Sequence, residues 1–244
     1  MKRLSILKWN VWYLEDIHNI AEFLSENKAD IICLQELTIN FDKQANVHTP
    51  NYIAEKLGYH VYFQEITFAD KEMKQANAVL SKYPILDSRT VWINEEQGSG
   101  NYDDEYRAYV EVTQDINGEK IKVGTVHMSY THKFEPSERK LAEAQKLVDA
   151  VSSNTEKFIL AGDFNAVPGS RVVTGIENLL NNCGPEYSEN TWTTKPFSYG
   201  GFEANTLDWR LDYVFATNDI KVTKAQVLTT EYSDHLPILV EIEL

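Results

Sequence analysis

The stretch FILAGDFN, which spans Phe158–Asn165, predicts a buried β-strand that ends in polar side chains. Asp163 and Asn165 lie two positions apart, and side chains at that spacing on an extended backbone point the same way. The carboxylate and the amide can therefore face one ligand at the carboxyl end of a strand, where open α/β sheets place their sites. An ordinary turn is the alternative, because Gly, Asp and Asn are all common turn residues.

The same order of elements occurs earlier in the chain. Residues 16–27 have apolar side chains at helical spacing, and the apolar run 31–34 that follows predicts a buried strand ending near Glu36. A helix with one apolar side over residues 141–151 likewise precedes the strand that ends at Asp163. The sequence thus predicts helix, buried strand and terminal acid twice.

Strands dominate the rest of the sequence. Further strands are predicted at residues 4–9, 59–63, 78–80, 211–216, 221–228 and 238–242, with a hairpin over 106–127 that turns at Asn117-Gly118, helices over 51–57 and 170–180, and an aromatic-rich loop over 192–202. Many strands with a few helices outside them predict an α/β (α+β) fold. We expect a four-layer α/β sandwich, in which two packed, mainly antiparallel sheets are flanked by helices.

Charge and composition narrow the class of protein. The 244 residues carry a formal net charge of -14, and such an acidic protein repels the phosphates of duplex nucleic acid. Cys33 and Cys183 lie far apart without metal-ligand spacing, which predicts two buried, reduced thiols. Lys8 interrupts the first apolar run too early for a signal peptide, and no run has transmembrane length. A soluble, cytoplasmic protein is expected, and no protein partner is indicated.

Six short segments place polar residues at predicted strand ends. They are Trp9-Asn10, Gln35-Glu36, Val126-His127, Asp163-Phe164-Asn165, Arg210-Leu211-Asp212-Tyr213 and Ser233-Asp234-His235-Leu236-Pro237. In this order and at these intervals, they resemble the endonuclease/exonuclease/phosphatase superfamily of metal-dependent phosphoesterases. The resemblance runs from Asn10 to Pro237. It implies a single catalytic domain over residues 1–244, and no Pro/Gly/Ser-rich linker divides that range.

Glu36 is the first candidate metal ligand. A carboxylate at the end of a buried strand is a hard oxygen ligand, and Mg²⁺ takes one or two such groups while it keeps several waters. A strand-end residue that turns out to solvent is the alternative. The resemblance implies that Asn10 and Asp234 join Glu36 at a Mg²⁺ site, where Mn²⁺ is a possible substitute, and that Asn10 also contacts the substrate phosphate. Taken alone, Asn10 also fits an ordinary turn.

Five residues are candidates for catalysis. Asp163 can polarise an attacking water and Asn165 can bind that water or the phosphate, because phosphoryl transfer needs positioning and charge neutralisation more than covalent chemistry. The resemblance implies that His127 and His235 contact the phosphate and that Asp212 orients the imidazole of His235. The alternatives are a core histidine for His127, a surface ion pair for Asp212 and a polar turn for His235.

Asn77 and Arg107 are candidates for contacting the substrate. Asn77 opens a strand and turn that resemble those of the family, and Arg107 can clamp an anion through two nitrogens. Pairing of Arg107 with the acidic residues 103–105 is the alternative, within a segment 94–105 that is expected to be a solvated, mobile loop. The aromatic residues of 192–202 can stack on a substrate or pack within the protein.

The sequence therefore predicts a Mg²⁺-dependent hydrolase of a phosphodiester or phosphomonoester, with water as the nucleophile. Its substrate is expected to be small or single-stranded, because Trp12 stands where many nuclease members carry an acid or an amide. Nuclease action on RNA or DNA is one alternative, and a non-catalytic phospholigand-binding module on the same fold is another. A paired-carboxylate glycosidase would leave both histidines and Asn165 without a role.

Overall fold

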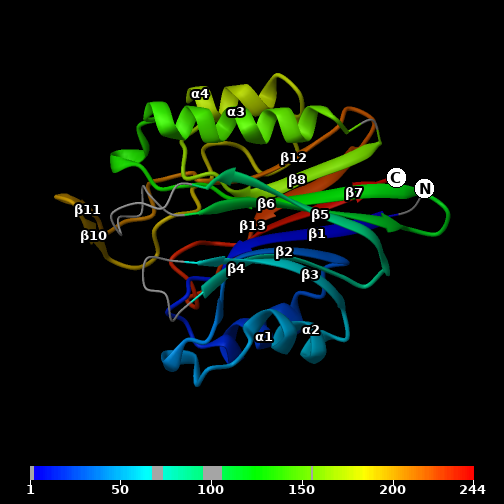
Figure 1. Cartoon of the computed structure of the whole chain (residues 1–244), viewed down its shortest axis with the longest axis horizontal. Coiled ribbons are helices and arrows are strands. Elements are labelled where there is room, and N and C mark those ends of the chain that lie inside the picture. Colours follow the sequence, from blue (N-terminus) through cyan, green and yellow to red (C-terminus); the bar gives the residue numbers. More distant parts are fainter. Residues whose placement is uncertain (1–2, 68–73, 96–105, 155) are drawn as a thin grey trace.

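Two six-stranded sheets pack face to face, and helices cover the outer face of each sheet (Figure 1). The structure is a computed structural model that describes residues 3–67, 74–95, 106–154 and 156–244. The first sheet has the strand order β13 (Lys221–Val227), β14 (Ile238–Glu243), β1 (Arg3–Asn10), β2 (Ile31–Ile39), β4 (Lys74–Ser81) and β3 (His60–Thr67). The second has the order β5 (Ile85–Asn94), β6 (Arg107–Asp115), β7 (Lys120–His127), β8 (Lys157–Asp163), β12 (Asp212–Ala216) and β9 (Asn181–Asn182).

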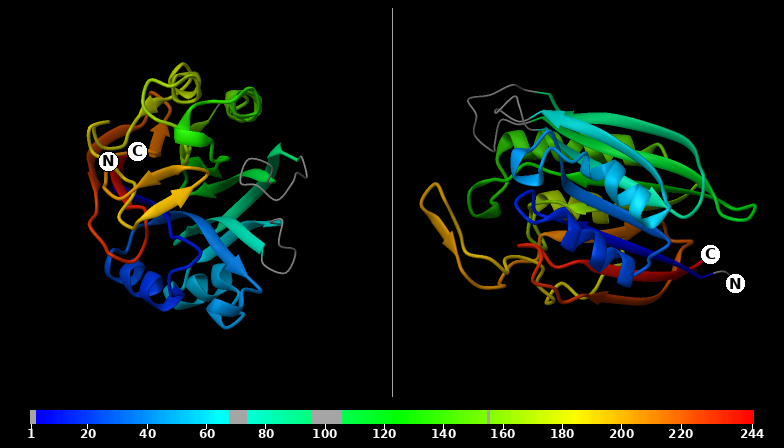
Figure 2. Two further views of the ribbon diagram at one scale, coloured as in Figure 1. Left: turned by 90° about the vertical axis from the view of Figure 1, so that its left-hand side faces the viewer. Right: turned by 90° about the horizontal axis from the view of Figure 1, so that it is seen from below.

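The helices form the two outer layers. α1 (Ile17–Glu26) and α2 (Thr49–Leu57) lie against the first sheet, and α3 (Glu138–Ser152) and α4 (Arg171–Glu177) lie against the second (Figure 2). Each sheet holds one parallel pair, β1 with β2 and β7 with β8, and the remaining described pairs are antiparallel. The predicted four-layer sandwich with mainly antiparallel sheets is confirmed.

The parallel pairs bring four strand ends to one edge. β1 and β2 are connected through α1, and β7 and β8 are connected through α3. The register places Asn10 opposite Gln35 in the first sheet and His127 opposite Asp163 in the second. Because parallel strands end at the same edge, the polar residues that close them are gathered there.

Alternate side chains along the strands fill the layer between the two sheets. In β1, Leu4 and Ile6 lie in the apolar core between the two sheets, whereas Leu7 and Trp9 pack with residues of α1 and α2. Lys8 follows Leu4 and Ile6 at the same two-residue spacing, and it is fully buried. The layer between the sheets is therefore apolar along most of its length and becomes polar where the strands end.

Helix ends and the main hairpin follow their sequence signals. Asp16 caps α1 by accepting a hydrogen bond from the backbone N–H of His18 at 2.9 Å. α2 begins slightly before the predicted start and ends at Gly58, whose φ of +70° suits glycine. The hairpin of β6 and β7 turns at Asn117-Gly118, where φ is +56° and +90°.

Three expectations about strands need correction. β2 does not end at Glu36 but continues to Ile39 after a bulge. β5 is absent from the sequence-based prediction, because most of its side chains are exposed or half-buried and its apolar pattern is weak. Part of the predicted aromatic loop is instead the hairpin β10 (Phe197–Tyr199) and β11 (Phe202–Ala204), which projects from the sandwich (Figure 2). The loop expected over 94–105 lies, beyond residue 95, outside the described residues.

Both cysteines are buried free thiols. Burial raises the pKa of Cys33 to about 12 and that of Cys183 to about 11, so both remain protonated at neutral pH. Within the described ranges, no helix combines the length and the apolar character needed to cross a membrane.

Candidate active site

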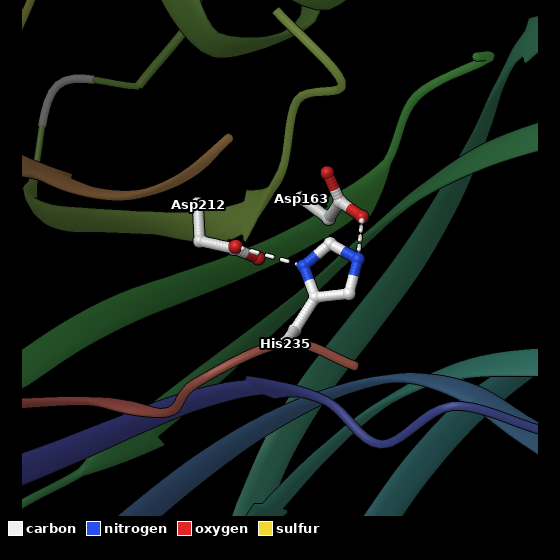
Figure 3. Close-up of side chains that lie close together, drawn as sticks. All are labelled: Asp163, Asp212 and His235. Atoms are coloured by element: carbon white, nitrogen blue, oxygen red, sulfur yellow. Dashed lines mark hydrogen bonds and ion pairs between the residues drawn. The ribbon is translucent and has the colours of Figure 1, made fainter. Parts of the chain in front are cut away.

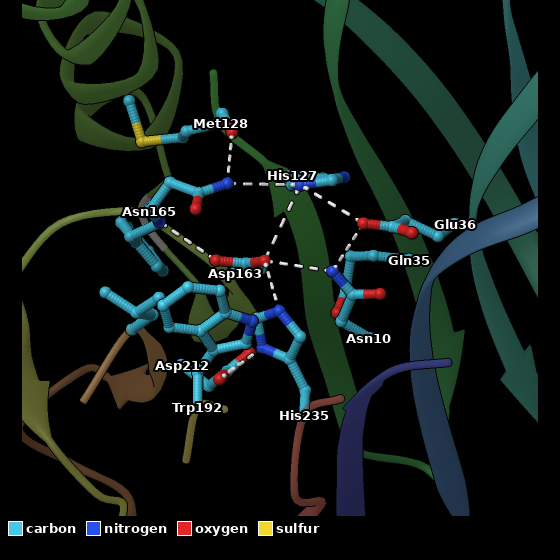
Figure 4. Close-up of polar contacts among 12 residues, drawn as sticks. Asn10, Gln35, Glu36, His127, Met128, Asp163, Asn165, Trp192, Asp212 and His235 are labelled. Carbon is cyan, nitrogen blue, oxygen red and sulfur yellow. Dashed lines mark hydrogen bonds and ion pairs between the residues drawn. The ribbon is translucent and has the colours of Figure 1, made fainter. Parts of the chain in front are cut away.

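Polar side chains from both sheets converge at the edge where the parallel strands end (Figure 4). Asn10 ends β1, His127 ends β7 and Asp163 ends β8, while Asp212 begins β12 directly opposite Asp163. His235 lies just before β14, which runs antiparallel beside β1. Each of these five residues is buried, with no more than 6% of its surface exposed. The space between the sheets thus ends in a buried polar cluster.

His235 lies between two carboxylates (Figure 3). Its Nδ1 is 2.9 Å from Asp212 Oδ2, and its Nε2 is 3.6 Å from Asp163 Oδ2. Lys8 Nζ forms an ion pair with the other oxygen of Asp212, and both of these side chains are fully buried. Burial lowers the pKa of Lys8 to about 7, while the charge of Asp163 opposes this shift. The row of side chains from Lys8 through Asp212 to His235 fixes how the imidazole faces Asp163.

His127 lies between two hydrogen-bond donors, and its Nε2 is also 3.8 Å from Glu36 Oε1. Arg107 Nη1 lies 3.3 Å from its Nδ1, and the amide nitrogen of Asn165 lies 3.2 Å from its Nε2. Both neighbours are hydrogen-bond donors, and a neutral imidazole can accept from one of them, whereas a protonated imidazole can accept from neither. Burial, and then the charge of Arg107, lowers the pKa of His127 well below its ordinary value. Burial and these donors disfavour the protonated form of His127, and the charge of Asp163 opposes that effect.

Asp163 lies between the two histidines. Its Oδ2 is 3.5 Å from His127 Nε2 and 3.6 Å from His235 Nε2, and its Oδ1 accepts from the backbone N–H of Asn165 at 2.9 Å. Burial alone would raise the pKa of Asp163, but His235, His127 and Lys8 together hold it below its ordinary value. Asp163 is consequently an ionised carboxylate that can accept hydrogen bonds.

Asn165 lies beyond β8 rather than on it. Its φ of +45° turns the chain, and its amide nitrogen donates to the carbonyl oxygen of Met128 at 3.0 Å. Simple alternation therefore does not describe the pair of Asp163 and Asn165, because the backbone leaves the extended conformation between them. Both residues still line the same cavity.

A bulge in β2 directs Glu36 into the site. The register of β2 against β4 shifts just before Leu37, and Glu36 has a left-handed φ of +62°. Gln35 donates to Thr125 Oγ1 of the opposite sheet at 2.8 Å, while Glu36 Oε1 accepts from Asn10 Nδ2 at 2.9 Å. In an unbroken strand, neighbours point to opposite faces. The bulge lets both Gln35 and Glu36 reach the polar cluster.

Glu36 and Asp234 are carboxylates with raised pKa values. Burial, and then the charge of Asp234, raises the pKa of Glu36 to about 6. Burial also raises the pKa of Asp234, and the charge of Asp163 adds to the effect. Asp234 Oδ2 accepts from Trp192 Nε1 at 3.1 Å, so Asp234 and His235 have different partners, as expected for neighbours on an extended chain.

These carboxylates suit a divalent cation. Glu36, Asp163 and Asp234 line one cavity, and a hard cation would relieve the cost of burying their charges together. Asp163, Asp212 and His235 also have possible ligand atoms within 4.8 Å of one another. However, both nitrogens of His235 already face these carboxylates, and Asp212 is paired with Lys8. Glu36 and Asp234, which are not paired with a described cationic side chain in this way, could therefore hold such a cation.

Asn10 bridges two of the carboxylates. Its amide nitrogen donates to Glu36 Oε1 at 2.9 Å and to Asp163 Oδ2 at 3.0 Å, while its oxygen accepts from the backbone N–H of Trp12 at 3.1 Å. In this arrangement its oxygen is bound to Trp12, so the structure shows Asn10 as a hydrogen-bonding link within the cluster.

The structure separates Asn77 from the site and places Arg107 in it. Asn77 donates to the carbonyl oxygen of Ala108 at 2.9 Å, which ties β4 to β6 across the two sheets, and it is absent from the described lining of the cavity. Arg107 lines the cavity and is only 2% exposed, so it is not the exposed arginine of the alternative interpretation. The acidic residues 103–105 lie outside the described residues.

Lys140 supports the site from α3, and the sequence analysis did not identify it. Its Nζ donates to the carbonyl oxygens of Ser129 and Phe164, so it joins the segments that follow β7 and β8. The residue is only 1% exposed. The sequence did indicate that Lys140 is buried, because it lies on the same helical face as the buried Ala144 and Leu147.

Lys8 and Ser233 were also missed. Lys8 shares the inward spacing of Ile6 and Asn10, so its burial could have been expected from the sequence. Ser233 Oγ donates to the carbonyl oxygen of Asn10 at 2.7 Å and accepts from the backbone N–H of His235 at 3.0 Å. No sequence pattern indicates that contact, because it joins residues 223 positions apart.

The cluster lines a cavity of about 300 Å³. The predicted site residues in its described lining are Glu36, Arg107, His127, Asp163, Asn165, Asp234 and His235, whereas Asn10 and Asp212 lie behind this lining. Much of the remaining lining is aromatic and consists of Trp12, Tyr13, Tyr130, Phe134, Trp192, Phe197 and Tyr199. A polar part and an aromatic part therefore belong to one site.

Comparison with known proteins agrees with the fold and identifies a family. The model of the Endonuclease/Exonuclease/phosphatase family matches residues 9–235. An endonuclease/exonuclease/phosphatase family protein from Leptotrichia buccalis C-1013-b is similar in structure, with a TM-score of 0.76 and 22% identity over 99% of this chain and 100% of that one. No curated protein sequence matches the chain.

Two further solved structures are similar in fold. The 2',3'-cyclic phosphatase ANGEL2, in complex with adenosine-2',3'-vanadate, has a TM-score of 0.68 and 18% identity over 98% of this chain and 95% of that one. The mannosyl-6-phosphatase Bt3783 of Bacteroides thetaiotaomicron VPI-5482 has a TM-score of 0.69 and 16% identity over 99% of this chain and 100% of that one.

Proposed function

The chain belongs to the endonuclease/exonuclease/phosphatase family, and from that premise we propose that it is a Mg²⁺-dependent phosphoesterase acting on a small phosphodiester or phosphomonoester. The observation that carries the proposal is the row of contacts from Asp212 through His235 and Asp163 to His127, of which the last three line one cavity. Such an arrangement offers an ionised carboxylate and two imidazoles close together, and these groups can supply the positioning and charge stabilisation on which phosphoryl transfer depends.

The proposed mechanism assigns a separate task to each group. Asp163 accepts a hydrogen bond from the attacking water and orients it for in-line attack. His127 and His235, whose Nε2 atoms both lie near Asp163 Oδ2, contact the phosphoryl oxygens. Asp212 and Lys8 act as positioning residues for His235. A Mg²⁺ ion bound by Glu36 and Asp234 would neutralise charge on the phosphate.

A small substrate fits the cavity better than a nucleic-acid duplex does. The cavity volume of about 300 Å³ lies at the lower end of the range for small-molecule sites. The protein's net charge of -14 disfavours the binding of polyanions such as a duplex. Two of the structural relatives are named as phosphatases. Nuclease action on a single-stranded end remains the second candidate. A panel of single-stranded RNA, abasic DNA, phosphoinositides and sphingomyelin separates these substrate classes.

Hydrolysis of bis-p-nitrophenyl phosphate is expected to require a divalent cation. Chelator should abolish the release of p-nitrophenolate, and Mg²⁺ or Mn²⁺ should restore it, because Glu36 and Asp234 are oxygen ligands suited to both ions. Glu36→Gln should weaken cation binding in calorimetry, whereas the exposed Glu26→Gln serves as the matched control. Tight cation binding without turnover of any phosphoester in the panel would instead indicate a non-catalytic binding module.

Cation binding is expected to weaken as the pH falls through about 6. The pKa of Glu36 is raised to about 6, so the neutral acid persists to that pH and a proton competes with the cation below it. One competing proton lowers the apparent affinity by about tenfold per pH unit below the pKa. Mn²⁺ titrations from neutral pH to about pH 5 measure how the affinity for the cation changes with pH. An affinity that does not change over this range would exclude Glu36 as a ligand.

A further inference from the structure

Part of the aromatic lining comes from an element that lies apart from the sandwich. Phe197 and Tyr199 belong to β10 of the projecting hairpin (Figure 2). Their ring centroids lie 5.8 Å and 5.9 Å from that of Tyr130, which follows β7. Because Phe197 and Tyr199 are two positions apart on a strand, their side chains point the same way. The hairpin therefore presents two rings to the cavity.

These rings are not simply core residues. Phe134, Trp192 and Phe202 form a buried cluster beside them, whereas Phe197 and Tyr199 remain partly exposed. The centroid of Phe197 lies 5.0 Å from that of Trp192, so the buried cluster supports the exposed rings. Packing explains why the buried rings are aromatic. It does not explain why partly exposed aromatic rings line a cavity that also holds the catalytic cluster.

Trp12 adds a ring from another part of the same cavity. Its φ of +58° is an unfavourable conformation for a bulky residue, and strain of this kind gathers at functional sites. The backbone N–H of Trp12 donates to the Asn10 oxygen, and Asn10 in turn contacts Glu36 and Asp163. The position of Trp12 is thereby linked to the catalytic carboxylates.

The chemistry of the lining favours a flat aromatic ligand. Outside the catalytic cluster and the aromatic rings, the described polar lining is Gln75, Lys195 and Ser198, so the rings supply most of the remaining contact surface. A cavity of about 300 Å³ is small for the chains of a phospholipid. Stacking of a nucleobase on aromatic side chains is, in contrast, strong, and every base has a flat face that can stack.

We propose that Trp12, Phe197 and Tyr199 form a subsite for an aromatic ring attached to the phosphoester, and that the substrate is a nucleobase-bearing compound of mononucleotide size. This inference rests on the proposed phosphoesterase function, since the catalytic cluster must hold the phosphate. The β10–β11 hairpin is then the element that determines which phosphoester is accepted.

Binding of adenosine 5'-monophosphate and of ribose 5-phosphate tests the subsite, because the two differ only by the base. Calorimetry with Mg²⁺ on the His235→Ala protein avoids turnover. We expect the nucleotide to bind at least about tenfold more tightly, and Phe197→Ala/Tyr199→Ala to remove that preference while ribose 5-phosphate affinity stays within about twofold. Trp12→Ala provides a second, independent variant, and Tyr52→Ala on α2 is the aromatic control that keeps the preference.

The outcomes separate the two proposals. Equal affinity for the two ligands, or a preference that survives both the hairpin variant and Trp12→Ala, overturns the ring subsite even if the wild-type protein hydrolyses phosphoesters. A base preference that depends on the hairpin supports the subsite. If that preference is found but the wild-type protein hydrolyses no phosphoester, the subsite stands and the phosphoesterase proposal fails.

Discussion

Replacing Asp163 by asparagine is expected to lower kcat for phosphoester hydrolysis by about 10²- to 10⁴-fold. The substitution keeps the shape of the side chain but removes the charge that His127 and His235 face at 3.5 Å and 3.6 Å. It also removes the ionised oxygen that is proposed to orient the attacking water. The measurement is the initial rate of p-nitrophenolate release at saturating Mg²⁺.

Asp219→Asn is the matched control for this substitution. Asp219 is exposed in the turn between β12 and β13, so its loss of charge should leave kcat within about twofold, as for most surface changes. Circular dichroism and thermal unfolding establish that both variants are folded. A fall of less than about fivefold in the folded Asp163→Asn protein would remove Asp163 from the mechanism.

Replacing Lys8 by methionine is expected to lower the free energy of unfolding by about 3–5 kcal/mol. Lys8 and Asp212 form an ion pair in which both side chains are fully buried, so the substitution leaves the carboxylate without its cation. Removing one partner of a buried pair is strongly destabilising for this reason. Urea unfolding at about pH 6, where Lys8 with its pKa of about 7 is mostly charged, measures the loss.

A double-mutant cycle distinguishes the pair from general damage to the core. Lys8→Met combined with Asp212→Asn should cost less than the sum of the two single changes, because neither charge is then left alone. Lys224→Met on the exposed side of β13 is the control for losing a lysine from a strand, and it should cost less than about 0.5 kcal/mol. Strictly additive single effects would show that the ion pair does not stabilise the fold.

The strand ends of the site could be read from the sequence because they depend on short-range rules. Apolar runs that close at Asn10, His127 and Asp163 have a two-residue spacing that assigns each polar side chain to one face of its strand. Parallel strands then end at one edge of a sheet. The family resemblance added the order of these segments and their association with a phosphoester.

Other parts of the site depend on local backbone departures that no periodicity predicts. Glu36 lies at a bulge of β2, and Asn165, which contacts His127, has a positive φ. The hairpin that carries Phe197 and Tyr199 resembles a loop in the sequence because its strands are too short to show alternation. Each of these features changes the direction of a side chain within one or two residues.

The sequence by itself determined the layered sandwich, the carboxylates and the histidines, because alternating apolar residues must be buried and the polar residues that end those strands follow from the same spacing. Only the tertiary structure decided which of these groups touch. Lys8 meets Asp212 across the two sheets, and Asn77 contacts the backbone of β6 instead of the cavity. Contacts of this kind join residues distant in the chain, so their geometry is set by how the two sheets pack and not by any local pattern.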